Sequence, residues 1–352
     1  MKAFATTAPA SPLELLEVDD PTPTGSEVYL ALTHSGVCHS DTHIHEGGYD
    51  AGRLGRISMA ARGLTYPAVL GHEMVGTVVA VGPDVTDVAV GDRRLVFPWI
   101  GCGECGRCAD GRENLCRKGK PLGVFAWGGF ASHVLVPHER YLIDIEGLDP
   151  AWAATLACSG LTSYSAVNQV LPLESTEAIA VIGTGGVGLM AVALLSHLTE
   201  AEIVAIDVSD ERLAIAQELG AHTVVNSTAL EAGETLESAL GRPVQAAIDF
   251  VNTGDTFLLA FGSIDKGGTI VAIGLFGGET TVPTVMLPLK NVHINGSYVG
   301  NLRQLQELVS LAKSVDLPKV PLIEQPLSLE NAQAGLDGLV AGTVRGRIIL
   351  TA

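Results

Sequence analysis

Apolar residues in the first part of the chain come in short runs that predict β-strands. The runs cover residues 1–6, 27–32, 74–82, 93–97 and 131–136, and Gly, Pro and Asp residues separate them. Many short strands divided by turns are typical of an antiparallel sheet that closes, wholly or partly, into a barrel. Residues 1 to about 150 are therefore predicted to form a β domain.

From about residue 160 the pattern changes to longer segments that alternate between strand and helix. Six strands are predicted at 178–183, 202–207, 222–226, 246–251, 268–274 and 292–300. Helices are predicted at 186–198, 210–220, 236–241 and 256–264. This alternation indicates a parallel sheet with helical crossovers. The tail from about 300 predicts one more helix, at 302–315, followed by short runs.

Composition fits a folded protein and narrows its partners. A chain of 352 residues is too long for one ordinary core, so two domains are expected. The net charge of −18, from 39 acidic and 21 basic side chains, repels phosphate backbones and argues against nucleic acid as a partner. An anionic cofactor would need a local cradle.

The chain shows no sign of export or of membrane insertion. Its N-terminus lacks the apolar core of a signal peptide. The most apolar window, 178–198, is long enough to span a bilayer, but it contains four glycines, and a buried strand, turn and helix explain it better. We expect a cytoplasmic protein with no membrane partner, in which six reduced cysteines are available for metal binding or chemistry.

Four of these cysteines form the strongest single motif. Cys102, Cys105, Cys108 and Cys116 lie in a Gly-rich stretch with spacings of two, two and seven residues. Four thiolates fill the tetrahedral shell of a zinc ion and leave no open position, which is typical of a structural site. Free surface cysteines and an iron–sulfur cluster are the alternatives, but the ending typical of bacterial ferredoxins is absent.

A second motif predicts dinucleotide binding. The stretch "GTGGVG", residues 183–188, follows a predicted strand and opens a predicted helix. Asp207 ends the next strand 19 residues after Gly188, at the spacing of a dinucleotide fingerprint. Backbone N–H groups at such a turn can bind a pyrophosphate. A Gly-rich turn used only for packing is the alternative.

The two remaining cysteines suggest a second zinc site. Cys38 in "SGVCHSD", Cys158 and His72 in "GHE" would give two thiolates and one imidazole, the three-ligand set of a catalytic zinc with an open fourth position. Taken singly, each cysteine could equally be a small buried hydrophobe and His72 a core histidine. The nearby dinucleotide motif favours the metal site.

The sequence resembles the zinc-dependent medium-chain alcohol dehydrogenases, in particular their tetrameric bacterial and yeast branch. The motifs "GVCHSD", "GHE", "VGDRR", the four-cysteine lobe, "LACSGLTSY", "GTGGVG", "GSYVGN" and "RGRIIL" occur in family order along the whole chain. The resemblance implies an α/β protein in which residues 1–159 and 300–352 form a GroES-like β-barrel catalytic domain, with a structural zinc lobe at 101–117. Residues 160–299 would form a Rossmann domain with a doubly wound, six-stranded parallel sheet that binds NAD.

The resemblance also implies a role for each candidate residue. Cys38, His72 and Cys158 would bind the catalytic zinc, and Asp41 would orient His72. Ser40 would hydrogen-bond the substrate oxygen, His43 would end a proton relay, and Glu73 would lie behind the metal. The predicted cofactor contacts are His39, Thr162, Gly183, Gly185, Gly186, Val187, Gly188, Asp207, Arg212 and Arg347.

These predictions describe an oxidoreductase that moves a hydride between a primary or secondary alcohol and NAD, with two zinc ions per subunit. A relative acting on polyols or thiol adducts, or a non-catalytic zinc and dinucleotide binder, is the alternative, although polyol members usually replace Cys158 with glutamate. The resemblance implies a homotetramer, with a dimer as second choice, because residues 292–301 resemble a family pairing edge.

One segment departs from the family pattern. Residues 44–70 are longer than in most relatives and include Ile57, Met59, Leu64 and Tyr66. We expect them near the substrate mouth, so the size of the pocket and the substrate do not follow from the resemblance. Trp99 either lines that pocket or packs in the core.

Overall fold

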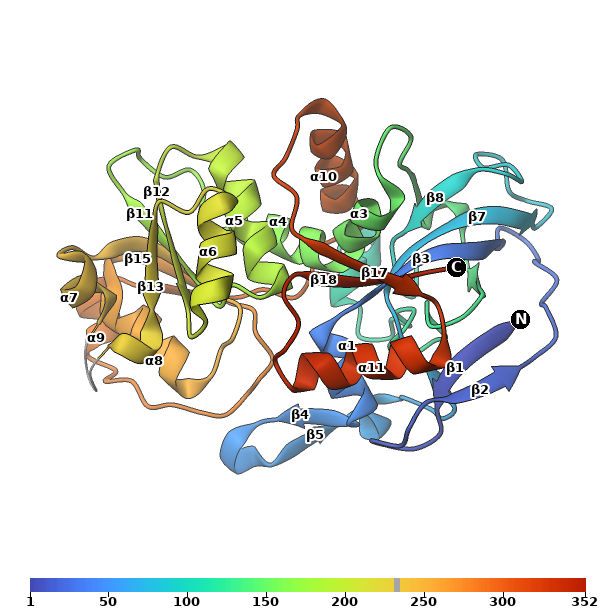
Figure 1. Ribbon diagram of the computed structural model, residues 1–352, viewed down its shortest axis with the longest axis horizontal. Coiled ribbons are helices and arrows are strands. Elements are labelled where there is room, and N and C mark those ends of the chain that lie inside the picture. The colour runs from blue at the N-terminus through green and yellow to red at the C-terminus, as the bar shows by residue number, and fades with distance from the viewer. Residues whose placement is uncertain (231–234) are drawn as a thin grey trace.

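The computed structural model describes residues 1–230 and 235–352. Figure 1 shows two regions side by side, one with both chain termini and one with strands β11 to β16. The apolar window 178–198 is divided between strand β11 (Ala178–Ile182) and helix α5 (Gly186–Leu198). Among the described residues, no helix combines the length and the apolar character that crossing a bilayer requires.

The first region is built on a seven-stranded sheet in the order β10-β8-β7-β3-β18-β17, with β9 also paired to β3. All of its pairings are antiparallel except that of β17 with β18. Its strands are β3 (Val28–Val37), β7 (Glu73–Val81), β8 (Arg93–Val96), β9 (His133–Val136), β10 (Leu142–Asp144), β17 (Leu322–Pro326) and β18 (Arg347–Thr351). The smaller sheets are β2 (Glu14–Glu17), β1 (Lys2–Thr6) and β6 (Ala68–Val69), and the hairpin β4 (Gly48–Asp50) with β5 (Arg56–Ser58). Because β18 pairs with β3, the end of the chain completes the domain that its beginning starts.

The second region contains the predicted parallel sheet, and its six strands are confirmed. They are β11, β12 (Glu202–Asp207), β13 (Thr223–Asn226), β14 (Val244–Asp249), β15 (Ile264–Ala272) and β16 (His293–Gly296). Their order is β13-β12-β11-β14-β15-β16, and every pairing is parallel. The order reverses between β11 and β14, and in such sheets ligands bind at the carboxyl ends of the strands beside this reversal.

The helices connect and cover these sheets. They are α1 (His39–His45), α2 (Gly106–Ala109), α3 (Pro150–Thr155), α4 (Leu161–Val167), α5, α6 (Asp210–Glu218), α7 (Leu236–Leu240), α8 (Gly254–Ser263), α9 (Met286–Lys290), α10 (Leu302–Ser314) and α11 (Leu329–Val340). Short 3₁₀ turns lie at Gly52–Leu54, Ala60–Arg62, Glu113–Leu115, Glu139–Tyr141 and Ser227–Ala229.

Alternating residues of the parallel sheet are buried on its two faces. On β11, Ile179 and Val181 belong to the large core that continues into the first region, whereas Ala180 and Ile182 belong to a second cluster on the other face. Burial on both faces explains why these strands appear in the sequence as continuous apolar runs.

The tail contains a helix that the sequence pattern did not predict, so the expectation of a single helix after residue 300 was wrong. Two glycines, Gly335 and Gly338, lower the helix propensity of α11. Ala332, Gly335 and Leu336 are buried nonetheless, and a Cβ atom at Gly335 would lie only 3.3 Å from Val37. The small residue therefore allows α11 to pack closely against β3.

Candidate active site and metal centres

Cys38, His72 and Cys158 come together at the centre of the molecule. Their ligand atoms lie within 4.8 Å of one another, with 3.9 Å between the two Sγ atoms. All three side chains are buried, and His72 Nε2 has no hydrogen-bond partner among the described residues. A buried, unpartnered imidazole nitrogen beside two thiols is costly in itself, but it fits a zinc ion with three protein ligands.

Asp41 organises this group from the first turn of α1. Its Oδ2 accepts a hydrogen bond from Cys38 N at 2.9 Å, and its Oδ1 lies 3.1 Å from His72 Nδ1 and accepts from Gly71 N. A proton on Nδ1 leaves the lone pair of Nε2 free for a metal. Asp41 thus contacts His72, the ligand that the resemblance assigns to it, and also the backbone of Cys38.

Cys158 reaches the site through an irregular turn. Residues Leu156–Gly160 make one turn with π-helical hydrogen bonding between α3 and α4. Such turns insert an extra residue into a helix and occur often at functional sites. The predicted domain boundary at 159/160 falls inside this continuous helical run.

Hydrogen bonding and charge favour a reactive sulfur at Cys38. The hydrogen bond from the Cys158 thiol lowers the pKa of Cys38 well below its usual range, and His72 acts in the same direction, although burial opposes both. The same contact raises the pKa of Cys158. Because the thiolate is the form that binds metal, this asymmetry prepares Cys38 as a ligand.

Glu73 and Arg347 form a buried ion pair directly behind the three-ligand group. Arg347 Nη2 donates to Glu73 Oε2, and Ser159 N donates to Glu73 Oε1 at 3.1 Å. Burial raises the pKa of Glu73, and the Arg347 charge opposes that shift. Both oxygens of Glu73 therefore have protein partners, and Glu73 is not one of the three clustered ligands.

Three histidines (His39, His43 and His45) and a serine follow Cys38 on α1. Ser40 is half-buried two residues after Cys38. The ring of His43 lies between those of His39 and Tyr49, with centroid distances of 5.3 and 5.4 Å. Burial lowers the pKa of His43, and nearby His39 lowers it further, so the neutral, proton-accepting form of His43 prevails at pH 7.

The four remaining cysteines lie together in a separate lobe, as their spacing predicts. The Sγ atoms of Cys102, Cys105, Cys108 and Cys116 lie within 4.8 Å of one another. Contacts between them run from 3.5 to 4.0 Å. Four converging sulfurs fit a tetrahedral zinc with no free position.

The Gly-rich turn has the geometry of an anion site. Gly183 has a φ of +85°, and a side chain at Gly188 would overlap the carbonyl oxygen of Gly183. Gly185 caps α5 without a side-chain hydrogen bond, which leaves the N–H groups of the first turn for a ligand. Arg347 packs against Gly186, and its buried Nε has no partner among the described residues. A pyrophosphate fits this combination.

Asp207 lies at the end of β12, as predicted, but its carboxylate is already occupied. It accepts hydrogen bonds from Thr184 N and Oγ1 and from Val208 N and Ser209 N. Arg212 Nη1 lies 3.7 Å from the same carboxylate. A cofactor ribose must therefore replace one of these donors, and the Thr184 hydroxyl is the one that can rotate away.

The other predicted cofactor contacts lie close to this turn. Thr162 is buried on α4, and its neighbour Ser163 donates a hydrogen bond to the carbonyl oxygen of Val187 at 2.8 Å. His39 lies 4.7 Å from Phe276, measured between ring centroids. Helix α4 therefore lies against the Gly-rich turn, and His39 on α1 lies against Phe276.

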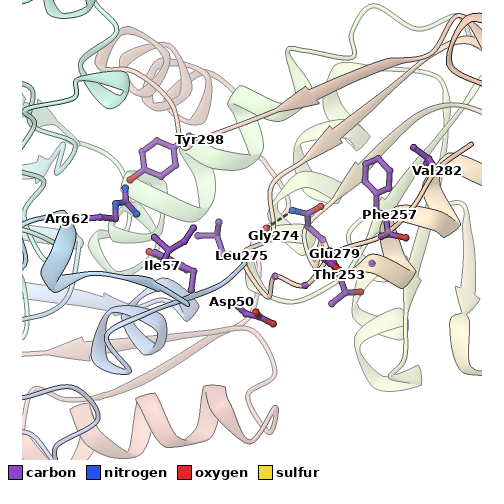
Figure 2. Close-up of a pocket in the computed structure, with 16 residues that line it drawn as sticks. Asp50, Ile57, Arg62, Thr253, Phe257, Gly274, Leu275, Glu279, Val282 and Tyr298 are labelled. Atoms are coloured by element: carbon purple, nitrogen blue, oxygen red, sulfur yellow. Dashed lines mark hydrogen bonds between the residues drawn. The ribbon is translucent and has the colours of Figure 1, made fainter. Parts of the chain in front are cut away.

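A cleft of about 640 Å³ lies between the two regions (Figure 2). The segment 44–70, which we expected near the substrate mouth, forms part of the wall of this cleft through Tyr49, Asp50, Ile57 and Arg62. Met59 and Leu64 instead belong to the core, and Tyr66 packs against it. Trp99 is buried, 5.4 Å from the His72 ring and 6.0 Å from the Tyr298 ring.

Most of the residues that line this cleft could not be predicted from a sequence pattern. Tyr49, Arg62, Leu275, Glu279 and Tyr298 come from separate segments, and no motif includes them all. Only the unusual length of segment 44–70 pointed to this place. The cleft lining depends on long-range packing, which a local pattern does not record.

Comparison with known proteins finds relatives along the whole chain. Residues 24–147 match the alcohol dehydrogenase GroES-like domain, and residues 186–314 match the zinc-binding dehydrogenase family. An NAD-dependent alcohol dehydrogenase of Sulfurisphaera tokodaii is 33% identical over 353 residues, covering 99% of each chain. The alcohol dehydrogenase structure from Aeropyrum pernix has 30% identity and a TM-score of 0.88, with complete coverage of both chains. Acetophenone reductase from Geotrichum candidum, solved in complex with NAD, has 27% identity and a TM-score of 0.85, covering 100% of this chain and 97% of that one. The chain therefore belongs to the zinc-dependent medium-chain alcohol dehydrogenases.

Proposed function

We propose that the protein is an NAD-dependent alcohol dehydrogenase that oxidises primary or secondary alcohols and reduces the corresponding aldehydes or ketones. The observation that carries the proposal is the buried group Cys38, His72 and Cys158, in which His72 Nε2 has no partner among the described residues. The similarity to the alcohol dehydrogenases of Sulfurisphaera tokodaii and Aeropyrum pernix supports it.

The proposal gives each part of the site a task. Zinc held by the three ligands supplies Lewis-acid chemistry at the substrate oxygen, and NAD supplies the hydride acceptor. Ser40 hydrogen-bonds the substrate oxygen and takes its proton. His43, neutral at pH 7, passes this proton to solvent. Asp41 holds His72 in one tautomer throughout.

The cofactor is assigned to the edge formed by the Gly-rich turn and β12. When NAD binds, His39, Arg347 and the N-terminus of α5 would hold its pyrophosphate, and Thr162 and Val187 would hold the nicotinamide. Asp207 and Arg212 would hold the adenosine ribose. A phosphate on the 2′ oxygen would meet the Asp207 carboxylate, so NAD is favoured over NADP, by roughly a thousandfold for a repulsion of several kcal/mol.

Two broader assignments accompany this activity. A homotetramer is proposed because β16 lies at the edge of the parallel sheet and exposes Ile294, which suits pairing with a second subunit. A cytoplasmic location is proposed because the six cysteines, none of which forms a disulfide, must stay reduced to bind metal.

Steady-state kinetics test the proposal directly. NADH absorbance is followed with a panel that runs from ethanol to long-chain and benzylic alcohols, with NAD and then with NADP. Elemental analysis of the same enzyme is expected to give two zinc ions per chain, one for each cysteine group. Absence of turnover with every alcohol and every carbonyl compound in zinc-replete enzyme would contradict the assigned activity.

A further inference from the structure

The segment 44–70 carries three arginines, and two of them have acidic partners. Arg53 Nε lies 3.0 Å from Glu279 Oε2, and Arg56 Nη2 lies 3.8 Å from Glu46 Oε2. Arg62 forms no ion pair with any carboxylate of the described residues. Arg62 is exposed and lines the cleft, so in a chain with a net charge of −18 its guanidinium is available to an anionic group from outside the chain.

The backbone that carries Arg62 is held in place at the wall of the cleft. It ends the 3₁₀ turn Ala60–Arg62, which Gly63 closes with a φ of +107°. Met59 and Leu64, on either side of the turn, are buried in the core, and Leu64 N donates to Met59 O at 3.0 Å. The guanidinium also lies 5.9 Å from the ring centroid of Phe125. The turn therefore holds the base of this cation in one place.

The surroundings of Arg62 suit the body of an organic substrate. Figure 2 shows Arg62 beside Tyr298, on the same side of the cleft as Ile57 and Leu275. Beyond Tyr298, ring contacts lead through Trp99 to His72. Trp99 is itself buried, so these contacts place the Tyr298 wall of the cleft next to the three-ligand group. A substrate that reacts at this group and extends past Tyr298 would meet the positive charge of Arg62.

We propose that Arg62 binds a carboxylate at the far end of the substrate, so that the preferred substrates are hydroxy acids and the matching oxo acids, with several carbon atoms between the two functional groups. This inference rests on the proposed alcohol dehydrogenase function and specifies its substrate class. A guanidinium offers a carboxylate two parallel N–H donors, which a neutral alcohol cannot use. The phenols of Tyr49 and Tyr298 are neighbouring lining groups that can add hydrogen bonds.

The carboxylate takes no part in the chemistry. The carbinol carbon loses a hydride to NAD and its hydroxyl loses a proton to the relay through Ser40. One hydroxy acid and one NAD thus give one oxo acid, one NADH and one proton. Because Arg62 contacts a part of the substrate that does not react, its contribution appears mainly in KM.

The test compares substrates of equal length that differ only in the terminal group. The zinc-loaded enzyme is assayed with NAD and 6-hydroxyhexanoate, the methyl ester of 6-hydroxyhexanoate, or 1-hexanol. We expect kcat/KM for the acid to exceed that for the ester roughly 10- to 30-fold, the worth of one charge-assisted hydrogen-bonded pair. In Arg62→Gln this ratio should fall toward one, chiefly through a higher KM for the acid, and Arg62→Lys should restore part of it.

Arg53→Gln is the matched control, because it removes the same charge from the same segment but from an arginine already paired with Glu279. The ratio of acid to ester should stay at the wild-type value in this variant. Turnover of 1-hexanol with an acid-to-ester ratio near one in wild type, or a ratio unchanged by Arg62→Gln, would overturn the role of Arg62 and leave the proposed function intact. No turnover of any of the three substrates would count against the proposed function itself.

Discussion

The buried group Cys38, His72 and Cys158 takes its members from three distant parts of the chain, whereas the four-cysteine lobe takes all of its members from residues 102–116. The first group is enclosed by the core and leaves His72 Nε2 without a protein partner. The lobe is more exposed, and its sulfurs accept hydrogen bonds from backbone N–H groups. Those of Glu104 and Cys105 lower the pKa of Cys102 to about 6.

This difference separates a site for chemistry from a site for stability. Three ligands leave a fourth position for a substrate oxygen, and the long-range fold supplies the surrounding relay and cleft. Four ligands close the shell, and the bound ion can then only hold its own loop together. The two sites should therefore fail in different ways when one ligand is removed.

The largest effect is expected for Cys38→Ala. Loss of one of three ligands removes the metal, and with it several kcal/mol of stabilisation of the reaction, or at least about a thousandfold in kcat. Zinc content should fall by one ion per chain, while circular dichroism and the melting temperature stay near wild type. Measurable turnover in a preparation that has lost this zinc would contradict the assignment.

Cys105→Ser should show the opposite pattern. The hydroxyl is a poor zinc ligand, so the lobe loses its ion and about 3 kcal/mol of stability, which corresponds to a Tm lower by roughly 5–10 °C. The remaining folded enzyme should keep most of its kcat at low temperature. Thermal unfolding and kinetics on the same sample test this prediction. A variant that has lost this zinc but keeps the wild-type Tm would show that the zinc of the lobe has no structural role.

A third variant, His43→Gln, tests whether the buried site depends on a proton relay. Burial and His39 lower the pKa of His43, while Glu46 opposes them, so the wild-type rate of alcohol oxidation should fall as pH drops through that lowered pKa. Glutamine cannot accept the proton, so oxidation should slow about tenfold near pH 7, with a smaller deficit at alkaline pH where hydroxide replaces the base. Parallel pH–rate profiles for the two enzymes would show that His43, a residue of α1, takes no part in proton transfer.

The two cysteine groups also differ in how far the sequence predicts them. The lobe is visible as a spacing, and the Gly-rich turn with Asp207 is visible as a strand, a turn and an acidic residue in register. The three-ligand group is less visible, because nothing local connects Cys38 with Cys158: the sequence suggests it through the two cysteines outside the lobe, His72 and the dinucleotide motif, and the family resemblance supports it. The π-helical turn that carries Cys158 packs against α5, α10 and β7, and no residue type in the sequence indicates such a turn.

Other features could not be predicted from the sequence either, because they depend on contacts between distant segments. The Glu73–Arg347 pair joins residues 274 positions apart, and its geometry depends on the pairing of β18 with β3. Helix α11 was hidden by glycines that the structure uses for close packing. Local chemistry is thus predictable from spacing, whereas burial partners and cleft walls are set by contacts between distant segments.

The smallest predicted effect tests whether the lobe is as separate from the cleft as this comparison suggests. Asn114, on the 3₁₀ turn inside the lobe, donates a hydrogen bond from Nδ2 to the carbonyl oxygen of Tyr298 at 2.9 Å. The next residue, Val299, has a φ of +46°, a left-handed conformation that is strained for a β-branched side chain and needs support from its surroundings. Asn114→Ala removes that support, an exposed hydrogen bond worth about 0.5–1 kcal/mol. The KM for alcohols that reach Tyr298 should therefore rise roughly two- to fivefold, while kcat and zinc content stay near wild type. Arg112→Ala is the control, since Arg112 pairs only with Asp110 on the lobe surface and its loss should leave KM unchanged. Equal KM values in Asn114→Ala and wild type would show that the lobe stabilises the fold without shaping the cleft.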